Sequence, residues 1–468
     1  MNVRQSVRQY AARQAVQRLL PLLARRRDET LIALTQVLER VASDPVHKVQ
    51  MQKLRELFQQ QHPALELARR VFTRAHPNIR RNLLSNLVLN AMYFSGEIRR
   101  ARAQQGLAAP FTLVISPTMR CNLRCYGCYA GEYRKEDDLP FEVLDRIVTE
   151  AKALGTYFFT ISGGEPFIIK DQLFELFRRH PDACFQIYTN GTLITQEVAE
   201  ELVAIGNAGP AISVEGFEEE TDGRRGKGTF AKIMQAMDHL REAGAIFGFS
   251  GTVTRHNVEI LGSEEFVDFL IEKGCMFGWY FLYMPVGRAP QPELMPTPGQ
   301  RRWLLHRTNH FRNTKPIFIA DFWNDARLVG GCMSGGRLYA HINNKGDLEP
   351  CVFVHFAVDN LKEKSLAEAL ESPFFRAIRK RFPWSDNMCT PCMIIDHPCI
   401  LREALAEGQA HPTHEGAESI IKELVPVLDR YAEEINRLAE PYRGTYGRHL
   451  WDVLLEAAGQ QPADEETG

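Results

Sequence analysis

From residue 111 to about residue 285, short apolar runs alternate with amphipathic stretches of helical period. The runs have the length and the β-branched or aromatic content of buried strands, and the stretches between them are long enough for helices. The strands are expected at residues 111–116, 156–162, 183–189, 210–215, 245–253 and 277–284, and the helices near residues 140–154, 171–180, 195–206, 229–243 and 263–273. Such alternation calls for parallel strands joined by crossover helices. The pattern therefore predicts an α/β fold, a partial (β/α)6 TIM-like barrel.

Other patterns flank this region. A helical N-terminal region precedes it, and the sequence Gly106-Leu-Ala-Ala-Pro110 breaks the helical pattern before the first strand. A small cysteine-rich α+β extension follows the barrel, and after it come helices and a polar end that is expected to be disordered. The expected domains are residues 1–105, 106–290, 291–410 and 411–468.

Composition narrows the class of protein. The chain has 468 residues, of which 44% are hydrophobic and 24% charged, as in soluble globular proteins. Its formal net charge of -2 gives no electrostatic case for nucleic acid. No apolar run approaches the roughly 18–20 residues that span a bilayer, and there is no secretory leader. The sequence predicts a cytoplasmic protein.

The first 27 residues contain seven arginines and no acidic residue. One interpretation is a solvated helix packed on the barrel. A second is a basic surface for anionic lipid or an acidic partner, which predicts a protein peripheral to the membrane. A third is a mitochondrial transit peptide.

The ten cysteines fall mostly into two groups, at 121–128 and 332–399. Such clustering in a large chain indicates metal or cluster ligation in a reducing cytosol. Cys121, Cys125 and Cys128 directly follow the first expected strand. Three thiols can hold three irons of a cubane cluster and leave the fourth iron open to a small molecule. A zinc site with a distant fourth ligand and an ordinary electron-transfer cluster are the alternatives.

The cysteine spacing, three residues and then two, resembles the cluster loop of the radical S-adenosylmethionine (radical SAM) enzymes. The segments after the next strands extend the resemblance. The glycine-rich segment after the second strand implies contact with the methionine amino group, and the segment after the fourth strand implies contact with the ribose. Either Arg224 or Arg225 could pair with the methionine carboxylate. The cofactor-binding residues so implied are Gly163, Gly164, Glu165, Pro166, Asn190, Ser213, Glu215 and Arg225. The sequence departs from the family at Gly127, where many members have an aromatic residue that packs on adenine; here Tyr126 and Tyr129 flank that position.

The second cysteine group surrounds a hairpin signal at residues 343–347. Its layout resembles the auxiliary-cluster extension called SPASM, or its shorter twitch form, found in many radical SAM enzymes. Its five thiols suffice for one [4Fe–4S] cluster: Cys332, Cys351 and Cys392, with Cys389 or Cys399 as the fourth ligand. A zinc site is the alternative.

The resemblance implies an enzyme that reductively cleaves S-adenosylmethionine at a [4Fe–4S] cluster and uses the 5′-deoxyadenosyl radical to abstract hydrogen from an unidentified substrate. It implies an auxiliary cluster and a reductant of the flavodoxin or ferredoxin type, and it assigns no catalytic side chain. The substrate class stays open between a peptide, a lipid chain and a small metabolite. A non-enzymatic iron–sulfur electron carrier and a zinc-stabilised binding protein are the alternative classes.

Overall fold

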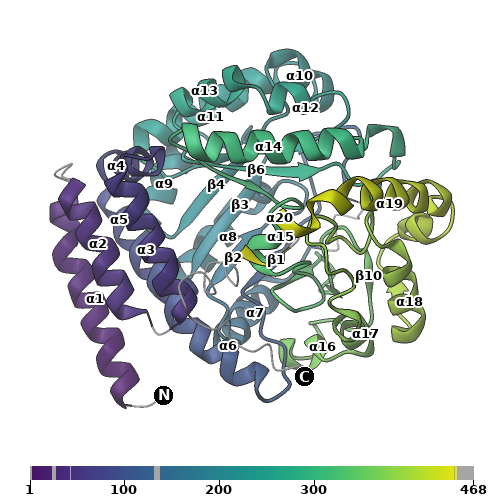
Figure 1. Ribbon diagram of the computed structural model, residues 1–468, viewed down its shortest axis with the longest axis horizontal. Coiled ribbons are helices and arrows are strands. Elements are labelled where there is room, and N and C mark those ends of the chain that lie inside the picture. The colour runs from purple at the N-terminus through teal and green to yellow at the C-terminus, as the bar shows by residue number, and fades with distance from the viewer. Residues whose placement is uncertain (1–2, 24–27, 43, 131–137, 447, 451–468) are drawn as a thin grey trace.

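The computed structural model describes residues 3–23, 28–42, 44–130, 138–446 and 448–450. A central sheet wrapped by helices lies between the N-terminal helices on one side and the C-terminal segment on the other (Figure 1). None of the described helices contains a hydrophobic stretch that could span a bilayer.

The central sheet has nine strands in the order β7-β6-β5-β4-β3-β2-β1-β8-β9. They are β1 (Thr112–Ile115), β2 (Phe158–Ile161), β3 (Cys184–Thr189), β4 (Ala208–Ser213), β5 (Gly248–Val253), β6 (Phe277–Leu282), β7 (Phe318–Asp321), β8 (Tyr339–Ile342) and β9 (Leu348–Glu349). Strands β1 to β6 are those that the hydrophobic pattern predicts, and they pair in parallel as expected. The α/β prediction is confirmed.

The sheet extends beyond these six strands at both edges. Strand β7 pairs in parallel with β6, and β8 pairs in parallel with β1, with Thr112 opposite Tyr339. The predicted hairpin is present, since β9 returns antiparallel to β8 and pairs His341 with Glu349. Because β8 covers the free edge of β1, this hairpin of the cysteine-rich extension is part of the barrel sheet.

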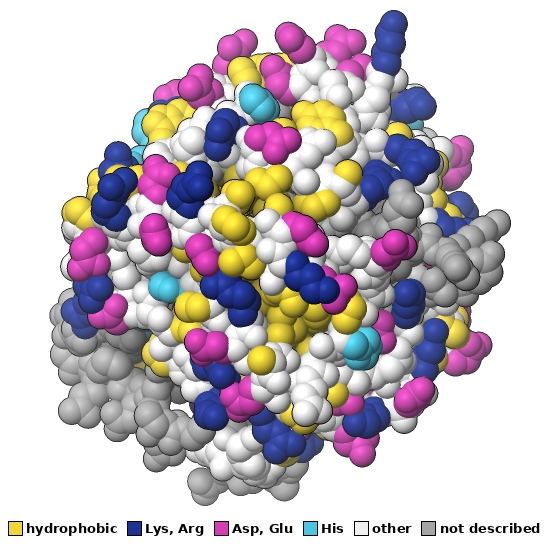
Figure 2. Space-filling view, turned by 90° about the vertical axis from the view of Figure 1, so that its right-hand side faces the viewer, with side chains coloured by type: hydrophobic (Ala, Val, Ile, Leu, Met, Phe, Trp, Pro, Cys, Tyr) yellow, Lys and Arg dark blue, Asp and Glu magenta, His cyan; other side chains and the backbone are white. Residues whose placement is uncertain are grey.

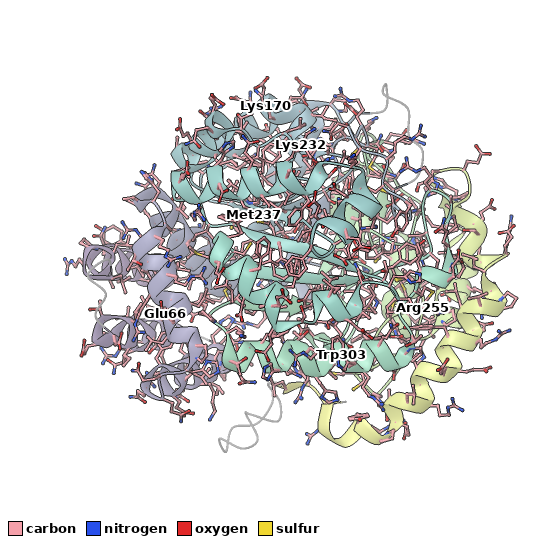
Figure 3. All side chains as sticks on the ribbon, turned by 90° about the horizontal axis from the view of Figure 1, so that it is seen from above. Glu66, Lys170, Lys232, Met237, Arg255 and Trp303 are labelled. Carbon is pink, nitrogen blue, oxygen red and sulfur yellow. The ribbon has the colours of Figure 1, made fainter. Side chains whose placement is uncertain are left out.

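Helices cover the outer face of the sheet (Figure 3). They are α7 (Phe141–Leu154), α8 (Lys170–Arg179), α9 (Gln196–Ile205), α10 (Glu218–Arg225), α11 (Thr229–Ala243), α12 (Val258–Leu261), α13 (Glu264–Lys273) and α14 (Pro298–Thr314). In α11, Ile233, Met237 and Leu240 are fully buried at helical spacing, whereas Lys232 faces solvent. The short 3₁₀ turns η3 (Pro166–Ile169) and η4 (Pro292–Leu294) lie in loops.

The N-terminal region has its own hydrophobic core. Its elements are α1 (Val3–Leu23), α2 (Asp28–Val41), α3 (Pro45–Gln59), α4 (Pro63–Arg74), α5 (Pro77–Asn82), the π-helix η1 (Leu83–Phe94) and α6 (Ser95–Ala103). It joins the barrel through buried polar contacts: Arg70 donates to the Pro316 and Ile271 carbonyls, and Asn86 to the Ala183 carbonyl. In α1, Arg13 donates to Asn90 Oδ1 at 2.7 Å, so one basic residue of the arginine-rich segment packs within the protein.

The C-terminal part packs on the opposite side (Figure 1). Its elements are α15 (Ala326–Val329), β10 (Phe356–Ala357), α16 (Leu366–Leu370), α17 (Pro373–Arg381), α18 (Pro398–Gly408), β11 (His411–Pro412), η5 (Ala417–Ile421), α19 (Val425–Ala439), η6 (Glu440–Tyr442) and α20 (Arg443–Tyr446). On the face that Figure 2 shows, acidic and basic side chains are interspersed. The expected disordered end, from residue 451, lies outside the described residues.

Candidate active site

The loop that carries Cys121, Cys125 and Cys128, here called the first cysteine loop, follows β1 directly. All three cysteines line one cavity of about 220 Å³, here called the large cavity. Asn190, at the carboxyl end of β3, donates a hydrogen bond to Asn122 Oδ1 at 2.8 Å and so holds this loop. The three thiols that the sequence groups together therefore face one space at the ends of the parallel strands.

The donor set fits an iron–sulfur cluster. The thiolates of a cubane bind different iron atoms, so they surround a volume. Among the described residues that line the large cavity there is no Asp, Glu or His, and the metal donors are the three thiols. Cys121 is exposed, and Cys125 and Cys128 are half-buried; a metal that binds a thiol displaces its proton.

The glycine segment after β2 packs its backbone against the first cysteine loop. A Cβ atom on Gly163 would lie 2.2 Å from the Thr118 carbonyl oxygen, and one on Gly164 would lie 2.2 Å from the Arg120 carbonyl oxygen. Neither position has room for a side chain, and Gly163 has a φ of +123°. Both glycines line the large cavity, so the peptide groups are what this segment offers to a ligand.

Glu165 is fully buried and is not among the described residues that line the large cavity. Its Oε1 accepts hydrogen bonds from the Thr189 hydroxyl at 2.7 Å and the Phe167 N–H at 3.1 Å, and its Oε2 accepts one from the Asn190 N–H at 2.7 Å. Burial raises the pKa of Glu165, and these donors oppose that rise. Glu165 thus fixes the end of β3, while its contact with an ammonium group stays a prediction. Pro166 begins the buried turn η3.

A buried charge cluster follows β4. Glu215 Oε1 accepts hydrogen bonds from Arg224 Nη1 at 2.6 Å and from Arg225 Nε at 2.9 Å. Burial disfavours the charge on Glu215, but the two guanidinium groups prevail and hold its pKa below the ordinary value. Both arginines and Ser213 line the large cavity, and Glu215 lies behind them. Two cations and one anion leave a net positive charge in this wall, which suits a ligand carboxylate.

The sequence places Gly127 where related loops have an aromatic residue. Gly127 has a φ of +60°, and a Cβ atom there would lie 2.6 Å from Tyr283 Cε2. Tyr283, directly after β6, therefore fills this space and lines the large cavity. Tyr129 also lines the cavity and hydrogen-bonds Ser162 at 2.8 Å, whereas Tyr126 is 44% exposed and does not line it. The distance along the chain hides Tyr283 from a motif search.

The interior of the large cavity is aromatic, a feature that the sequence analysis missed. Phe158, Tyr188, Trp279 and Phe281 project into it from β2, β3 and β6. The Trp279 and Phe281 rings stack with centroids 5.8 Å apart, and Tyr188 meets Phe281 edge-on at 5.4 Å. The two-residue spacing in β6 was the available signal, because alternate strand residues face one side.

Three cysteines of the second group line one cavity, and the other two lie outside it. Cys332, Cys351 and Cys392 line an apolar cavity of about 40 Å³, here called the small chamber. Cys389 is half-buried on the Cys392 loop, and Cys399 is exposed on α18. Burial raises the pKa of the three chamber cysteines, that of Cys351 to about 12. Three sulfurs around an apolar space fit a cluster, and Cys389 is better placed than Cys399 to be the fourth ligand.

A buried ion pair holds the Cys389–Cys392 loop. Arg301 of α14 pairs with Asp396 at 2.5 Å, and both side chains are at most 1% exposed. Asp396 Oδ2 also accepts from the Cys392 N–H at 2.9 Å, and Arg301 Nη2 donates to the Cys389 carbonyl at 3.1 Å. Neither residue was singled out from sequence, because an isolated charge carries no signal of its partner.

A second buried network joins β1 to the β8–β9 hairpin. His341 Nε2 hydrogen-bonds Ser116 Oγ at 2.8 Å, and His341 Nδ1 hydrogen-bonds Glu349 Oε2 at 2.6 Å. This order resembles a Ser-His-acid triad. None of the three residues lines the large cavity or the small chamber, so the network serves to fix the two strands.

Comparisons with known proteins agree with these two sites. The family model described as "Radical SAM superfamily" matches residues 115–268, and the model described as "Iron-sulfur cluster-binding domain" (SPASM) matches residues 332–393. The first match spans the first cysteine loop and the segments after β2 to β4. The second spans four of the five cysteines of the second group.

Two curated relatives illustrate the range of the similarity. The mycofactocin maturase MftC of Mycobacterium ulcerans (strain Agy99) is 30% identical over 307 residues, which cover 62% of this chain and 82% of that protein. The AdoMet-dependent heme synthase of Methanosarcina barkeri (strain Fusaro / DSM 804) is 25% identical over 301 residues, which cover 58% of this chain and 85% of that protein.

The fold has a counterpart among solved structures. Streptococcus suis SuiB bound to its precursor peptide SuiA superposes with a TM-score of 0.53 at 20% sequence identity, over 61% of this chain and 70% of that chain. At this identity the likeness concerns the fold.

Proposed function

The chain belongs to the radical SAM superfamily and carries a SPASM domain, and on this premise we propose that it modifies an apolar or aromatic side chain of a peptide. It is a radical SAM enzyme that binds S-adenosylmethionine, a [4Fe–4S] cluster and an auxiliary cluster. When bound and reduced, the first cluster and S-adenosylmethionine supply a 5′-deoxyadenosyl radical that takes hydrogen from the substrate. The protein must hold the reacting carbon in place and exclude water.

The residues around the large cavity have distinct roles in this proposal. The first cysteine loop binds the first cluster. The backbone of Gly163 and Gly164 meets the amino group of S-adenosylmethionine, and Arg225, with its net positive surroundings, meets the carboxylate. Asn190 and Ser213 line the remaining wall beside the nucleoside. Glu215 orients the two arginines from behind.

In the second site, Cys332, Cys351 and Cys392 bind the auxiliary cluster, with Cys389 as the fourth ligand. The support is their shared chamber and the clamp on the Cys389–Cys392 loop. Cys399 lies on α18, outside the loop that this clamp holds, which disfavours it as a ligand.

The lining of the large cavity carries the substrate proposal. Its interior is formed by aromatic rings, aliphatic and thioether side chains and hydroxyl groups. Its charged side chains within the described residues are Arg224 and Arg225, both bound to Glu215. Burial of an apolar side chain against such a surface stabilises it by about 1.5–3 kcal/mol, whereas burial of an unpaired charge is costly. The reacting group of the substrate is therefore uncharged.

Peptide and tetrapyrrole are the two classes that the relatives' names suggest. Carboxylate-rich tetrapyrroles need several cations to pair with, and the two cations of the described cavity wall, Arg224 and Arg225, are bound to Glu215 and in this proposal serve the carboxylate of S-adenosylmethionine. The cavity therefore favours the apolar side chain of a peptide, and a tetrapyrrole is the second candidate.

The electron donor in this proposal is a protein of the flavodoxin or ferredoxin type. Contact of the N-terminal arginines with an anionic membrane has less support, because Arg13 donates to Asn90 and lies over the Phe94 ring.

Isotope transfer tests the substrate class. A deletion strain that lacks the gene for this protein is grown with deuterated aliphatic and aromatic amino acids. Its peptide, lipid and tetrapyrrole fractions are then incubated separately with the reconstituted enzyme, S-adenosylmethionine and dithionite. We expect 5′-deoxyadenosine one mass unit heavier with the peptide fraction. In parallel cultures the lipids and tetrapyrroles are labelled with deuterated precursors of their own. Deuterium transfer from one of these fractions and not from the peptide fraction would overturn the proposal. The Cys125→Ala enzyme is the matched control and should release no 5′-deoxyadenosine.

A further inference from the structure

The large cavity and the small chamber share a wall. Four side chains line both spaces: Phe322, Met333, Tyr339 and Phe353. The Phe322 ring meets the Tyr339 ring edge-on, with centroids 6.1 Å apart. Of these four, Tyr339 alone has a hydroxyl group, and that hydroxyl contacts a cysteine sulfur.

The direction of this contact is fixed by its second partner. Tyr339 Oη lies 2.7 Å from Cys351 Sγ and accepts a hydrogen bond from the Val352 N–H at 3.1 Å. Because a backbone N–H can only donate, the tyrosine oxygen is the acceptor there. Its own proton is then directed at the Cys351 sulfur.

The hairpin register builds this contact into the fold. Strands β8 and β9 pair His341 with Glu349, and the same antiparallel register continued by two residues places Tyr339 opposite Cys351. Directly opposed residues share one face of a hairpin. Tyr339 is 2% exposed, so its ring is held between the two spaces by packing on both sides.

We propose that Tyr339 is a positioning residue for the auxiliary cluster: its hydroxyl donates a hydrogen bond to the Cys351 sulfur and raises the reduction potential of the cluster, while its ring separates that cluster from the substrate cavity. Hydrogen bonds to the sulfurs are among the determinants of cluster potential. A donor stabilises the reduced cluster, which carries one more negative charge, and therefore favours its formation. This inference rests on the proposed role of Cys351 as a ligand.

The test is a redox titration of the auxiliary cluster, in which the reduced cluster is monitored by electron paramagnetic resonance. The full chain with alanine at all three cysteines of the first cysteine loop isolates the signal of the auxiliary cluster. Adding Tyr339→Phe keeps the ring and removes the hydroxyl. We expect unchanged iron and sulfide content and a midpoint potential shifted to more negative values.

Tyr280→Phe is the matched control. Tyr280 is fully buried, and its hydroxyl donates to the Leu261 carbonyl at 2.5 Å instead of to a sulfur. Its loss should leave the potential unchanged. Equal potentials with and without the Tyr339 hydroxyl, or an equal shift in the Tyr280→Phe protein, would overturn the proposal.

Two further outcomes are distinguishable. Absence of iron from the isolating background would overturn the auxiliary-site assignment, and this inference with it. If the Tyr339→Phe protein does not bind the cluster, the proposal is tested with 3-fluorotyrosine at position 339. This residue keeps the ring, and its hydroxyl is a stronger hydrogen-bond donor than that of tyrosine. The midpoint potential must then rise, and an unchanged value would refute the role of the hydroxyl.

Discussion

Arg301→Gln tests whether a buried ion pair outside the cysteine motifs is needed for the auxiliary site. Arg301 and Asp396 are at most 1% exposed and pair at 2.5 Å. Removing one partner of such a pair leaves an uncompensated buried charge and costs about 3–5 kcal/mol, a large part of the roughly 5–15 kcal/mol that stabilises a domain. The loop that carries Cys389 and Cys392 should therefore loosen. After anaerobic reconstitution, iron should fall from about eight to about four atoms per chain, while cleavage of S-adenosylmethionine persists.

The double variant Arg301→Gln with Asp396→Asn is the control. It removes both charges together and keeps an amide oxygen that can accept from the Cys392 N–H. Because the cost of the single change comes from the orphaned carboxylate, the double variant should recover part of the lost iron and thermal stability. A single variant that keeps all its iron, with a double variant no more stable, would refute the reasoning.

Three other results are expected. Alanine at any one cysteine of the first cysteine loop should abolish the release of 5′-deoxyadenosine in the presence of dithionite, measured by liquid chromatography. Cys332→Ala or Cys351→Ala should retain cleavage of S-adenosylmethionine but block formation of the product. The reverse pattern would mean that the two sites are assigned the wrong way round. Glu165→Ala tests the predicted contact of this carboxylate with the ammonium group of S-adenosylmethionine: it should leave the first cluster in place and weaken binding about ten- to hundred-fold in equilibrium dialysis, because loss of a hydrogen bond to a charged group costs about 1.5–3 kcal/mol. Unchanged affinity would limit Glu165 to its hydrogen bonds at the end of β3. Gly127→Ala should lower the thermal midpoint more than Gly106→Ala. Both glycines have positive φ, but only a Cβ at position 127 would meet the Tyr283 ring, at 2.6 Å. Equal losses would show that Tyr283 moves aside freely.

The six barrel strands were predictable because each is a short apolar run that can be recognised from its own residues, without knowledge of the segments that pack on it. Phe159 and Ile161 in β2, for example, are fully buried. The first cysteine loop was predictable for the same reason, since its three thiols are neighbours in sequence. The hairpin signal at residues 343–347 also held, because turn residues determine it locally.

What the sequence could not give depends on contacts between distant segments. The pairing of β8 with β1 joins residues more than two hundred positions apart, and so does the hydrogen bond between Ser116 and His341. The hydrogen bonds of Glu165 to Thr189 and Asn190 at the end of β3 were not predicted, while its contact with the cofactor stays a prediction. A carboxylate in a glycine-rich turn gives no sign of which donors will reach it.

The position of the two sites on one sheet bears on the size of the substrate. The first cysteine loop follows the carboxyl end of β1, whereas Tyr339 lies opposite Thr112, the residue that begins this strand. With a rise of about 3.3 Å per residue, the four-residue strand separates these levels by about 10 Å. The large cavity is lined at both levels, by Cys121 at one and by Thr112 and Tyr339 at the other. A substrate group that reaches the first cysteine loop and also contacts the wall of the small chamber must extend over much of this depth. A long or aromatic side chain, fixed by its own peptide outside the cavity, can do so, whereas a compact metabolite would reach only one end.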